Sequence, residues 1–310
     1  MISDGRLRLK ADLALVLITL IWGATFVIVK RALPDISTTL FVAIRFGIAT
    51  VLLAVFLRGR WIPPRERLWW TLRRGAALGA SLIAGYILQT LGLEYTTASK
   101  AGFITGFYIP LVPFLLMFVF TNGRFQTVWP KRVEALGILI ATLGVVLMTL
   151  PDENLTVGRG DLLVLVSTLA YAVQIILLGR WSGKIPFESL AVLQIGFGAM
   201  FAAFVLPWVD TPPRVTLTGP VVFAIVTSAV FATALVFGLQ SWAQQYTTPT
   251  RTALIFSLEP LFAWVTAWLV EGEKLTPKAI TGGLAILAGI LLVELKPSVL
   301  SGHPFKSVDG

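Results

Sequence analysis

The tripeptide Tyr95-Thr96-Thr97 occurs a second time in the chain, as Tyr246-Thr247-Thr248. Residues around the two copies also agree. A glutamine precedes each tyrosine by six positions, and a basic residue follows it by five; these are Gln89 with Gln240 and Lys100 with Arg251. A shared pattern of this width indicates an internal repeat, which has to be recognised before single elements are assigned.

Matching residues extend in both directions from this segment. Asp12 pairs with Asp161, Trp22 with Tyr171, and the glycine pair Gly137/Gly144 with Gly282/Gly289. The chain therefore reads as one unit of about 150 residues written twice. We expect a first repeat over residues 1–155, a second over residues 156–297, and a tail over residues 298–310.

The composition is that of a protein embedded in a lipid bilayer. Hydrophobic residues make up 56% of the 310 and charged residues 13%, whereas a soluble domain carries about 25% charged residues. The net charge is +9, and the basic residues cluster between the apolar runs. This position indicates that they set the orientation of the spans in the membrane rather than bind nucleic acid. Cysteine is absent and the single histidine is His303. We therefore expect no metal site and no cofactor.

Ten apolar runs are each long enough to cross about 30 Å of hydrocarbon as a helix. They cover residues 13–29, 38–57, 75–91, 101–120, 133–150, 162–178, 189–207, 221–242, 252–270 and 279–293. The first run is too long for a signal peptide and lacks a cleavage site after it, so we expect it in the mature protein. The predicted fold class is an all-α polytopic membrane protein.

The distribution of Lys and Arg predicts the orientation. If the amino terminus is cytoplasmic, that side holds 17 of the 25 basic residues, the other side holds 7, and Arg45 lies within a span. Both termini are therefore expected in the cytoplasm. Because five spans per repeat is an odd number, the second repeat enters the membrane from the opposite side, and the two halves are inverted repeats. This construction is typical of secondary transporters that work by alternating access.

Four predicted spans carry an aromatic residue followed three positions later by a polar one, which places both on one helix face. These eight residues are candidates to line a substrate-binding cavity. They are Trp22 and Thr25, Tyr86 and Gln89, Tyr171 and Gln174, and Phe237 and Gln240. The alternative is that the aromatic rings pack in the core and the amides link helices.

Two charged residues fall well inside the spans, Arg45 and Glu259. Glu259 is a candidate carrier of a coupling proton, or else a structural carboxyl group; Arg45 is expected to reach toward the surface or to cap a helix. Pro260 should free a backbone carbonyl and kink its span, and Pro110 and Pro113 should break the corresponding span of the first repeat. These three prolines are hinge candidates. The paired glycines should allow close contact between the last span of each half, or between two copies in a homodimer.

Several short motifs of this chain resemble those of the EamA-type members of the drug/metabolite transporter superfamily. They are Trp22-Gly23, Arg45-Phe46, Glu259-Pro260 and Gly272-Glu273, together with the glycines of the last span. The first half departs from the family pattern, with Asn122-Gly123 where a Gly-Glu pair is usual. Aromatic-rich cavity candidates and the basic segment 58–74 are most similar to bacterial exporters of aromatic amino acids.

The resemblance implies export of aromatic and other neutral amino acids, or small amphiphilic metabolites, across the bacterial inner membrane. The alternative within the superfamily is a drug or nucleotide-sugar carrier. An enzyme is not expected. An intramembrane enzyme would need either a nucleophile next to a base or a cluster of metal ligands, and the predicted spans offer neither. A channel is not expected either, because no ring of like charges or carbonyl filter motif is visible.

Overall fold

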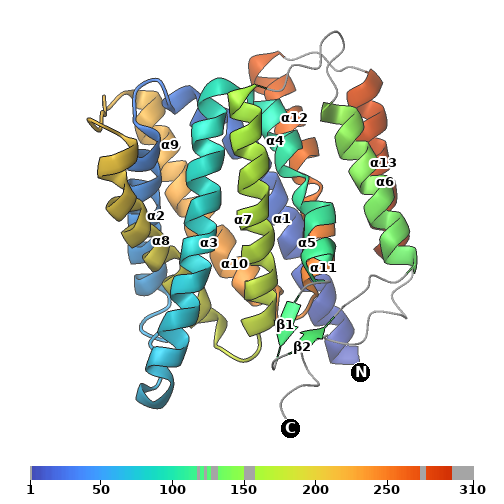
Figure 1. Ribbon diagram of the computed structural model, residues 1–310, viewed down its shortest axis with the longest axis horizontal. Coiled ribbons are helices and arrows are strands. Elements are labelled where there is room, and N and C mark those ends of the chain that lie inside the picture. Colours follow the sequence, from blue (N-terminus) through green and yellow to red (C-terminus); the bar gives the residue numbers. More distant parts are fainter. Residues whose placement is uncertain are drawn as a thin grey trace.

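The computed structural model describes residues 2–116, 119–121, 124–126, 132–149, 158–272 and 277–294. Its helices form one bundle, with the first helix starting at the end marked N in Figure 1. The elements of the first half are α1 (Ile2–Ala32), α2 (Thr38–Phe56), the short 3₁₀ helix η1 (Arg65–Arg67), α3 (Leu68–Tyr95), α4 (Ala98–Thr105), α5 (Tyr108–Leu116), β1 (Val119–Thr121), β2 (Arg124–Gln126) and α6 (Arg132–Thr149).

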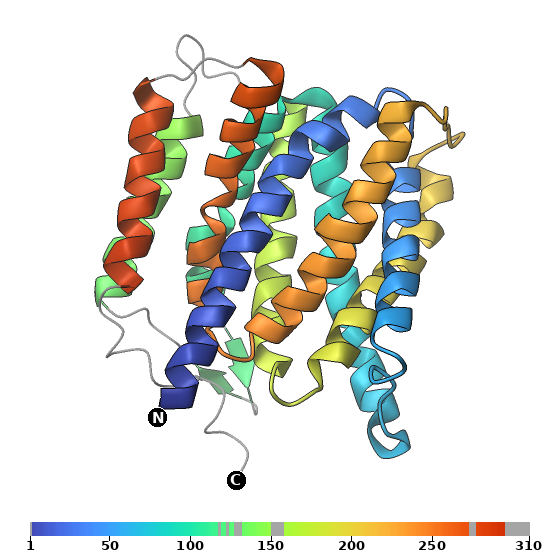
Figure 2. The ribbon, with the colours of Figure 1, turned by 180° about the vertical axis from the view of Figure 1, so that it is seen from behind.

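The second half contains a similar series of helices (Figure 2). These are α7 (Arg159–Trp181), α8 (Phe187–Val209), α9 (Gly219–Ala229), the π-helical segment η2 (Val230–Leu235), α10 (Val236–Ala243), α11 (Pro249–Phe256), α12 (Glu259–Glu271) and α13 (Pro277–Glu294).

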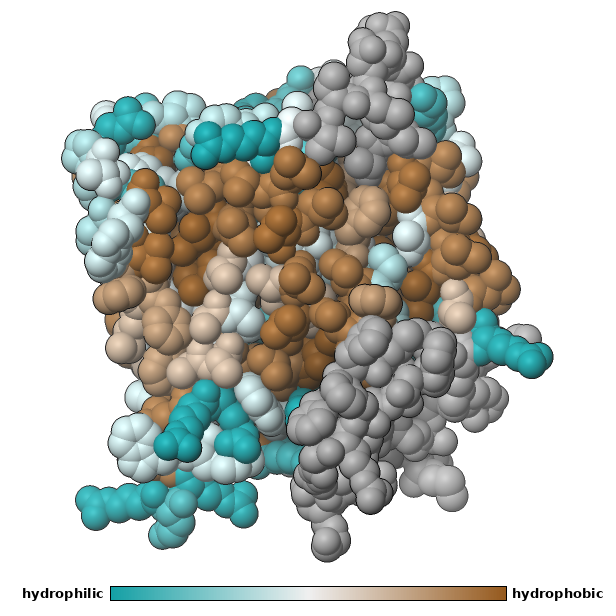
Figure 3. All heavy atoms as spheres, in the orientation of Figure 1, coloured by the Kyte–Doolittle hydropathy of each residue, from teal (hydrophilic) through white to brown (hydrophobic). Residues whose placement is uncertain are grey.

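Eight helical segments in the described part of the chain are long and apolar enough to cross a membrane. They coincide with eight of the ten predicted spans. The other two predicted spans, 133–150 and 279–293, fall on α6 and α13, of which 18 residues each are described. A broad hydrophobic band crosses the middle of the molecule in Figure 3, with hydrophilic residues above and below it.

One predicted span ends differently from expectation. The apolar run 101–120 predicts residues 119 and 120 within a span, but Val119–Thr121 forms β1, which pairs antiparallel with β2. The sequence between the two strands is Asn122-Gly123, a dipeptide favoured in two-residue hairpin loops. The all-α expectation therefore holds for the helical bundle but omits this short ribbon.

Two spans are interrupted in the middle, at matching positions of the two halves. The first interruption separates α4 from α5 just before Pro110, and the second separates α11 from α12 just before Pro260. Proline cannot donate to the carbonyl four residues earlier, and its ring clashes with that carbonyl. The breaks predicted at Pro110 and Pro260 are confirmed. The break predicted at Pro113 is wrong, because Pro113 lies inside the continuous helix α5. The role of the three prolines as hinges stays a prediction.

The last helices of the two halves, α6 and α13, pack directly on each other. A Cβ atom added to Gly144 would lie 2.5 Å from the carbonyl oxygen of Gly282, and one added to Gly289 would lie 2.5 Å from that of Gly137. Only glycine permits this approach of two backbones. The glycine pairs therefore join the two halves, as expected for one of their two predicted roles.

Candidate functional site

A pocket lies inside the bundle, and all eight residues predicted from the aromatic–polar pattern line it. Trp22 and Thr25 come from α1, Tyr86 and Gln89 from α3, Tyr171 and Gln174 from α7, and Phe237 and Gln240 from α10. The further lining residues are Phe26, Val29, Arg45, Leu82, Thr90, Leu93, Thr105, Tyr108, Ile175, Phe256 and Glu259. The structure thus brings the predicted set together around one space.

Aromatic rings form much of the wall. The Trp22 ring lies 5.1 Å from that of Phe256 and 5.6 Å from that of Phe237, measured between centroids. Tyr86 meets Tyr171 edge to face at 5.6 Å. Edge-to-face and tilted pairs at such distances are favourable beyond the area they bury. The rings therefore support one another and hold a defined wall.

The amide side chains that line the pocket also link helices. Gln89 donates to Thr105 Oγ1 at 2.9 Å and accepts from the Tyr171 hydroxyl at 2.9 Å, so it joins α3 to α4 and α7. Gln240 donates to Gln174 Oε1 at 3.3 Å, and Gln174 donates to Gln194 Oε1 at 3.0 Å. The alternative reading of these amides, as links between helices, is therefore confirmed by geometry. The Oε1 atom of Gln240 is buried and has no hydrogen-bond partner among the residues that the structure describes.

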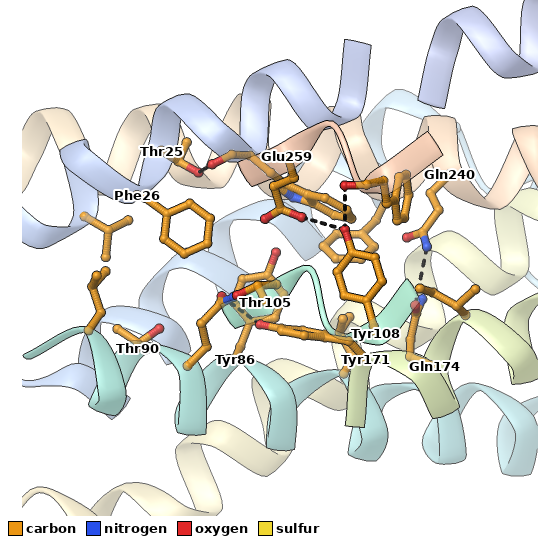
Figure 4. A pocket seen from close by; sticks show the side chains of 18 of the residues that line it. Thr25, Phe26, Tyr86, Thr90, Thr105, Tyr108, Tyr171, Gln174, Gln240 and Glu259 are labelled. Atoms are coloured by element: carbon orange, nitrogen blue, oxygen red, sulfur yellow. Dashed lines mark hydrogen bonds between the residues drawn. The ribbon is translucent and has the colours of Figure 1, made fainter. Parts of the chain in front are cut away.

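Glu259 lies beside Tyr108 in the pocket wall, and a hydrogen bond joins the two side chains (Figure 4). The Tyr108 hydroxyl lies 3.1 Å from Glu259 Oε2 and 2.7 Å from the carbonyl oxygen of Phe256. That carbonyl stands four residues before Pro260, which has no N–H to donate to it. The carbonyl predicted to be freed by Pro260 is thus bound by Tyr108.

The Tyr108 hydroxyl has a single hydrogen, and the Phe256 carbonyl can only accept. When Tyr108 donates to Phe256, its oxygen can accept a hydrogen bond from a protonated Glu259 carboxyl group. An ionised Glu259 would instead require Tyr108 to donate to it and to release Phe256. The arrangement therefore couples the hydrogen bonding of Tyr108 to the protonation of Glu259.

Arg45 does not reach toward the surface as the sequence suggested, because its side chain is buried and lines the pocket. Its Nε donates to Thr233 Oγ1 at 2.6 Å and its Nη2 to the carbonyl oxygen of Ala232 at 2.9 Å. Both acceptors belong to the π-helical segment η2, which also offers the Ala232 carbonyl to Trp22 Nε1 at 3.1 Å. Single π-helical turns of this kind are common at functional sites.

Tyr108 was missed by sequence reasoning, although the repeat contained a signal for it. Tyr108 and Glu259 are 151 positions apart, the same separation that relates Gln89 to Gln240 and Lys100 to Arg251. Applying this offset to Glu259 identifies Tyr108 as its counterpart in the first half. The two counterparts meet in the structure.

A family model described as the EamA-like transporter family matches this chain twice, over residues 9–150 and 158–295. The chain belongs to the EamA-like transporter family. It is 34% identical over 298 residues to a protein of Archaeoglobus fulgidus named only as an uncharacterized transporter, covering 95% of this chain and 89% of that protein.

Two further similarities extend over most of the chain. A Chlamydia muridarum protein named S-adenosylmethionine/S-adenosylhomocysteine transporter is 26% identical over 296 residues, covering 88% of this chain and 86% of that protein. A crystal structure titled only as that of a protein superposes with a TM-score of 0.72 at 15% identity, covering 92% of this chain and 96% of the other, and shares its fold.

In the described part of this EamA-like chain, no three or more His, Cys, Asp or Glu residues lie together so that they could hold a metal ion. The charged groups that line its pocket are Arg45 and Glu259. Neither forms an ion pair with another described residue. The pocket thus combines aromatic walls with one cationic and one carboxyl group, which form no ion pair with each other or with another described residue.

Proposed function

We propose that this EamA-like protein is a secondary transporter that exports small zwitterions with an aromatic or apolar body, aromatic and other neutral amino acids in particular. It would resemble the bacterial aromatic amino acid exporter YddG in this. In this proposal ten spans form two inverted five-helix repeats, residues 1–155 and 156–297. Both termini lie on the cytoplasmic side of the bacterial inner membrane, and transport proceeds by alternating access.

The observation that carries the proposal is the pair of pocket charges, Arg45 and Glu259. Charged groups within a membrane are costly and are usually functional. An amino acid carries one carboxylate and one ammonium group, which are complementary to a guanidinium and a carboxylate respectively. A ligand with both charges would compensate Arg45 and Glu259 together, whereas a ligand with one charge would leave the other group uncompensated.

The aromatic walls supply the second part of the specificity. A planar side chain beside Trp22, Phe237 and Phe256 would gain about 0.5–1.5 kcal/mol per well-placed ring beyond the area it buries. The name of the Chlamydia relative supports the same class of ligand, because S-adenosylmethionine joins an amino acid head to an aromatic base. The alternative, a drug or nucleotide-sugar carrier, has less support, since Arg45 is the only cationic group that lines the pocket as described.

Counterflow into proteoliposomes loaded with unlabelled phenylalanine would test the proposal. Labelled phenylalanine should accumulate, and unlabelled tryptophan should compete with it. Phenethylamine lacks the carboxylate and 3-phenylpropionate lacks the ammonium group, so each should compete about tenfold less well, a difference of about 1.4 kcal/mol. In Arg45→Gln the disadvantage of phenethylamine should disappear, while that of 3-phenylpropionate should remain.

Equal competition by all three compounds in the unmodified protein would rule out recognition of a zwitterion. Counterflow of a nucleotide sugar without counterflow of amino acids would establish the alternative. Arg60→Gln is a suitable control, because Arg60 is exposed and lies outside the pocket.

A further inference from the structure

Four charged residues outside the pocket form two ion pairs that relate to the sequence repeat. Lys100 Nζ lies 2.6 Å from Asp161 Oδ2, and Arg251 Nη2 lies 2.8 Å from Asp12 Oδ2. Lys100 and Arg251 occupy the same position of the two repeats, as do Asp12 and Asp161. Each ion pair therefore joins the basic residue of one repeat to the acidic residue of the other.

The two ion pairs lie at opposite ends of the bundle. Asp12 is near the start of α1, whereas Lys30 near its end donates to the carbonyl oxygens of Leu93 and Glu94, close to Thr96. Thr96 in turn donates to Asp161. Asp12 and Lys30 are separated by about 27 Å along α1 at 1.5 Å per residue. Figure 1 shows the same arrangement, with α1 and α7 starting at opposite ends.

The local structure around the two basic residues is the same. Thr97 caps the amino-terminal end of α4 by accepting from the Lys100 backbone N–H at 3.2 Å, and Thr248 caps α11 by accepting from that of Arg251 at 3.2 Å. The repeated Tyr-Thr-Thr tripeptide thus forms a corner between two helices in each half. The ion pair attaches this corner to the first helix of the other half, α7 or α1.

The side chains of both ion pairs are largely shielded from solvent. Arg251 is 5% exposed and Asp12 13%, while Asp161 is 7% and Lys100 32% exposed. Arg251 binds both carboxylate oxygens of Asp12, through Nε at 3.1 Å and Nη2 at 2.8 Å. Asp161 instead accepts from Lys100, from Thr96 at 2.7 Å and from the backbone N–H of Gly158 at 2.9 Å. Breaking either pair leaves a poorly hydrated charge, so each pair resists separation of its corner from the other half.

We propose that these are two latches, one at each end of the pocket, and that Asp12, Arg251, Lys100 and Asp161 are positioning residues of the transport cycle. The inference rests on the alternating access proposed above. In this structure both latches are closed. Opening of the pocket at one end requires release of the pair at that end only, because the repeats meet there across the ion pair. The pair at the opposite end stays closed and keeps that end sealed.

The test uses the fact that the chain has no cysteine. Ile175→Cys introduces a reporter thiol into the pocket lining, and a membrane-impermeant maleimide is applied to either face of sealed vesicles. Asp161→Asn should raise the labelling rate about tenfold from the face that carries the Lys100–Asp161 pair, and not from the other. Asp12→Asn should raise it about tenfold from the face that carries the amino terminus. Lys100→Gln breaks the same Lys100–Asp161 pair by changing its basic member, so it should reproduce the effect of Asp161→Asn.

Glu271→Gln is the matched control. Glu271 forms an exposed ion pair with Arg31 at 3.7 Å, also between the two halves, but it has no counterpart in the repeat. This variant should leave both labelling rates unchanged. The charge-exchanged double variant Asp12→Arg/Arg251→Asp should return the rate raised by Asp12→Asn to that of the unmodified protein, which a merely misfolded site would not do.

Labelling that rises equally from both faces in Asp161→Asn and Lys100→Gln, or that does not change in either, would overturn the proposal. If one of the two variants fails to fold, the other decides. No substrate is needed, so the outcome is independent of which compound is transported. One-sided labelling without amino acid counterflow would support the latches and contradict the proposed substrate.

Discussion

Thr96 and Thr247 occupy the same position of the two repeats but have different surroundings. Thr96 donates to the Asp161 carboxylate at 2.7 Å, whereas Thr247 Oγ1 is buried and finds no hydrogen-bond partner in the described part of the chain. A hydrogen bond to a charged group stabilises a fold by about 1.5–3 kcal/mol, while removal of an unpaired buried hydroxyl costs little. We therefore expect Thr96→Val to lower the thermal unfolding temperature in detergent and Thr247→Val to leave it unchanged or raise it. Equal effects of the two substitutions would contradict this expectation.

A second prediction for a single residue concerns Glu259. If the Glu259 carboxyl group exchanges its proton for the ammonium group of the substrate, Glu259→Gln should abolish transport driven by a pH difference. Substrate-for-substrate exchange should persist at raised substrate concentration, because glutamine fills the same space. The measurement is uptake into proteoliposomes with and without a pH difference. A pH response that Glu259→Gln leaves intact would reduce Glu259 to a structural role.

At this scale the sequence predicted which side chains meet, but not what each of them binds. The repeated aromatic–polar spacing identified four helices and eight pocket residues, because spacing determines the face of a helix. It suggested that the amides could link helices but did not identify the partner of each amide, so the hydrogen bond between Gln174 and Gln240 was not predicted. For Arg45 the sequence predicted either a reach toward the surface, which its burial contradicts, or a bond to a neighbouring helix. Its acceptors, Ala232 and Thr233, could not be identified because they are far away in the chain.

The interrupted helices show the same limit at the level of elements. Pro110 and Pro260 predicted breaks in two spans, because proline has a direct steric effect on the preceding turn. The π-helical segment Val230–Leu235 was not predicted, since it contains neither proline nor glycine. Its irregular turn is accompanied by tertiary contacts: Trp22 and Arg45 both donate to Ala232. A feature that depends on such contacts cannot be derived from local sequence.

Helix α3 crosses α8 at Gly79, and this contact yields a prediction for the element. A Cβ atom added to Gly79 would lie 2.9 Å from both the Gln194 carbonyl oxygen and the Gly198 nitrogen, which are backbone atoms of α8. Gly79→Ala should therefore push the helices apart and destabilise the protein by about 1–3 kcal/mol. Gly47→Ala in α2 is the control, because a Cβ atom there meets no atom of the described residues within 4 Å. This substitution should be neutral or stabilising by up to about 1 kcal/mol. Thermal unfolding in one detergent compares the two.

For the whole molecule, the repeat was the most informative feature of the sequence. It related the acids and bases of the two ion pairs and the glycines that join α6 to α13, all of which meet in the structure. The direction in which each half crosses the membrane is not a property of the bundle alone. It depends on the distribution of basic residues relative to the bilayer.

The last prediction therefore concerns orientation. The connection before α3 contains Arg65, the first residue of η1, and the connection before α9 contains Leu217; both residues are exposed. The two loops adjoin opposite ends of α2, because the Thr216 N–H donates to the Asp35 carbonyl just before α2 begins, whereas Arg65 follows the end of α2. With the basic side in the cytoplasm, an impermeant maleimide added to intact cells should label Leu217→Cys and should not label Arg65→Cys. Permeabilisation should make Arg65→Cys reactive, which shows that its thiol is accessible. Labelling of Arg65→Cys in intact cells, with Leu217→Cys protected, would place the amino terminus outside and reverse the proposed direction of both halves.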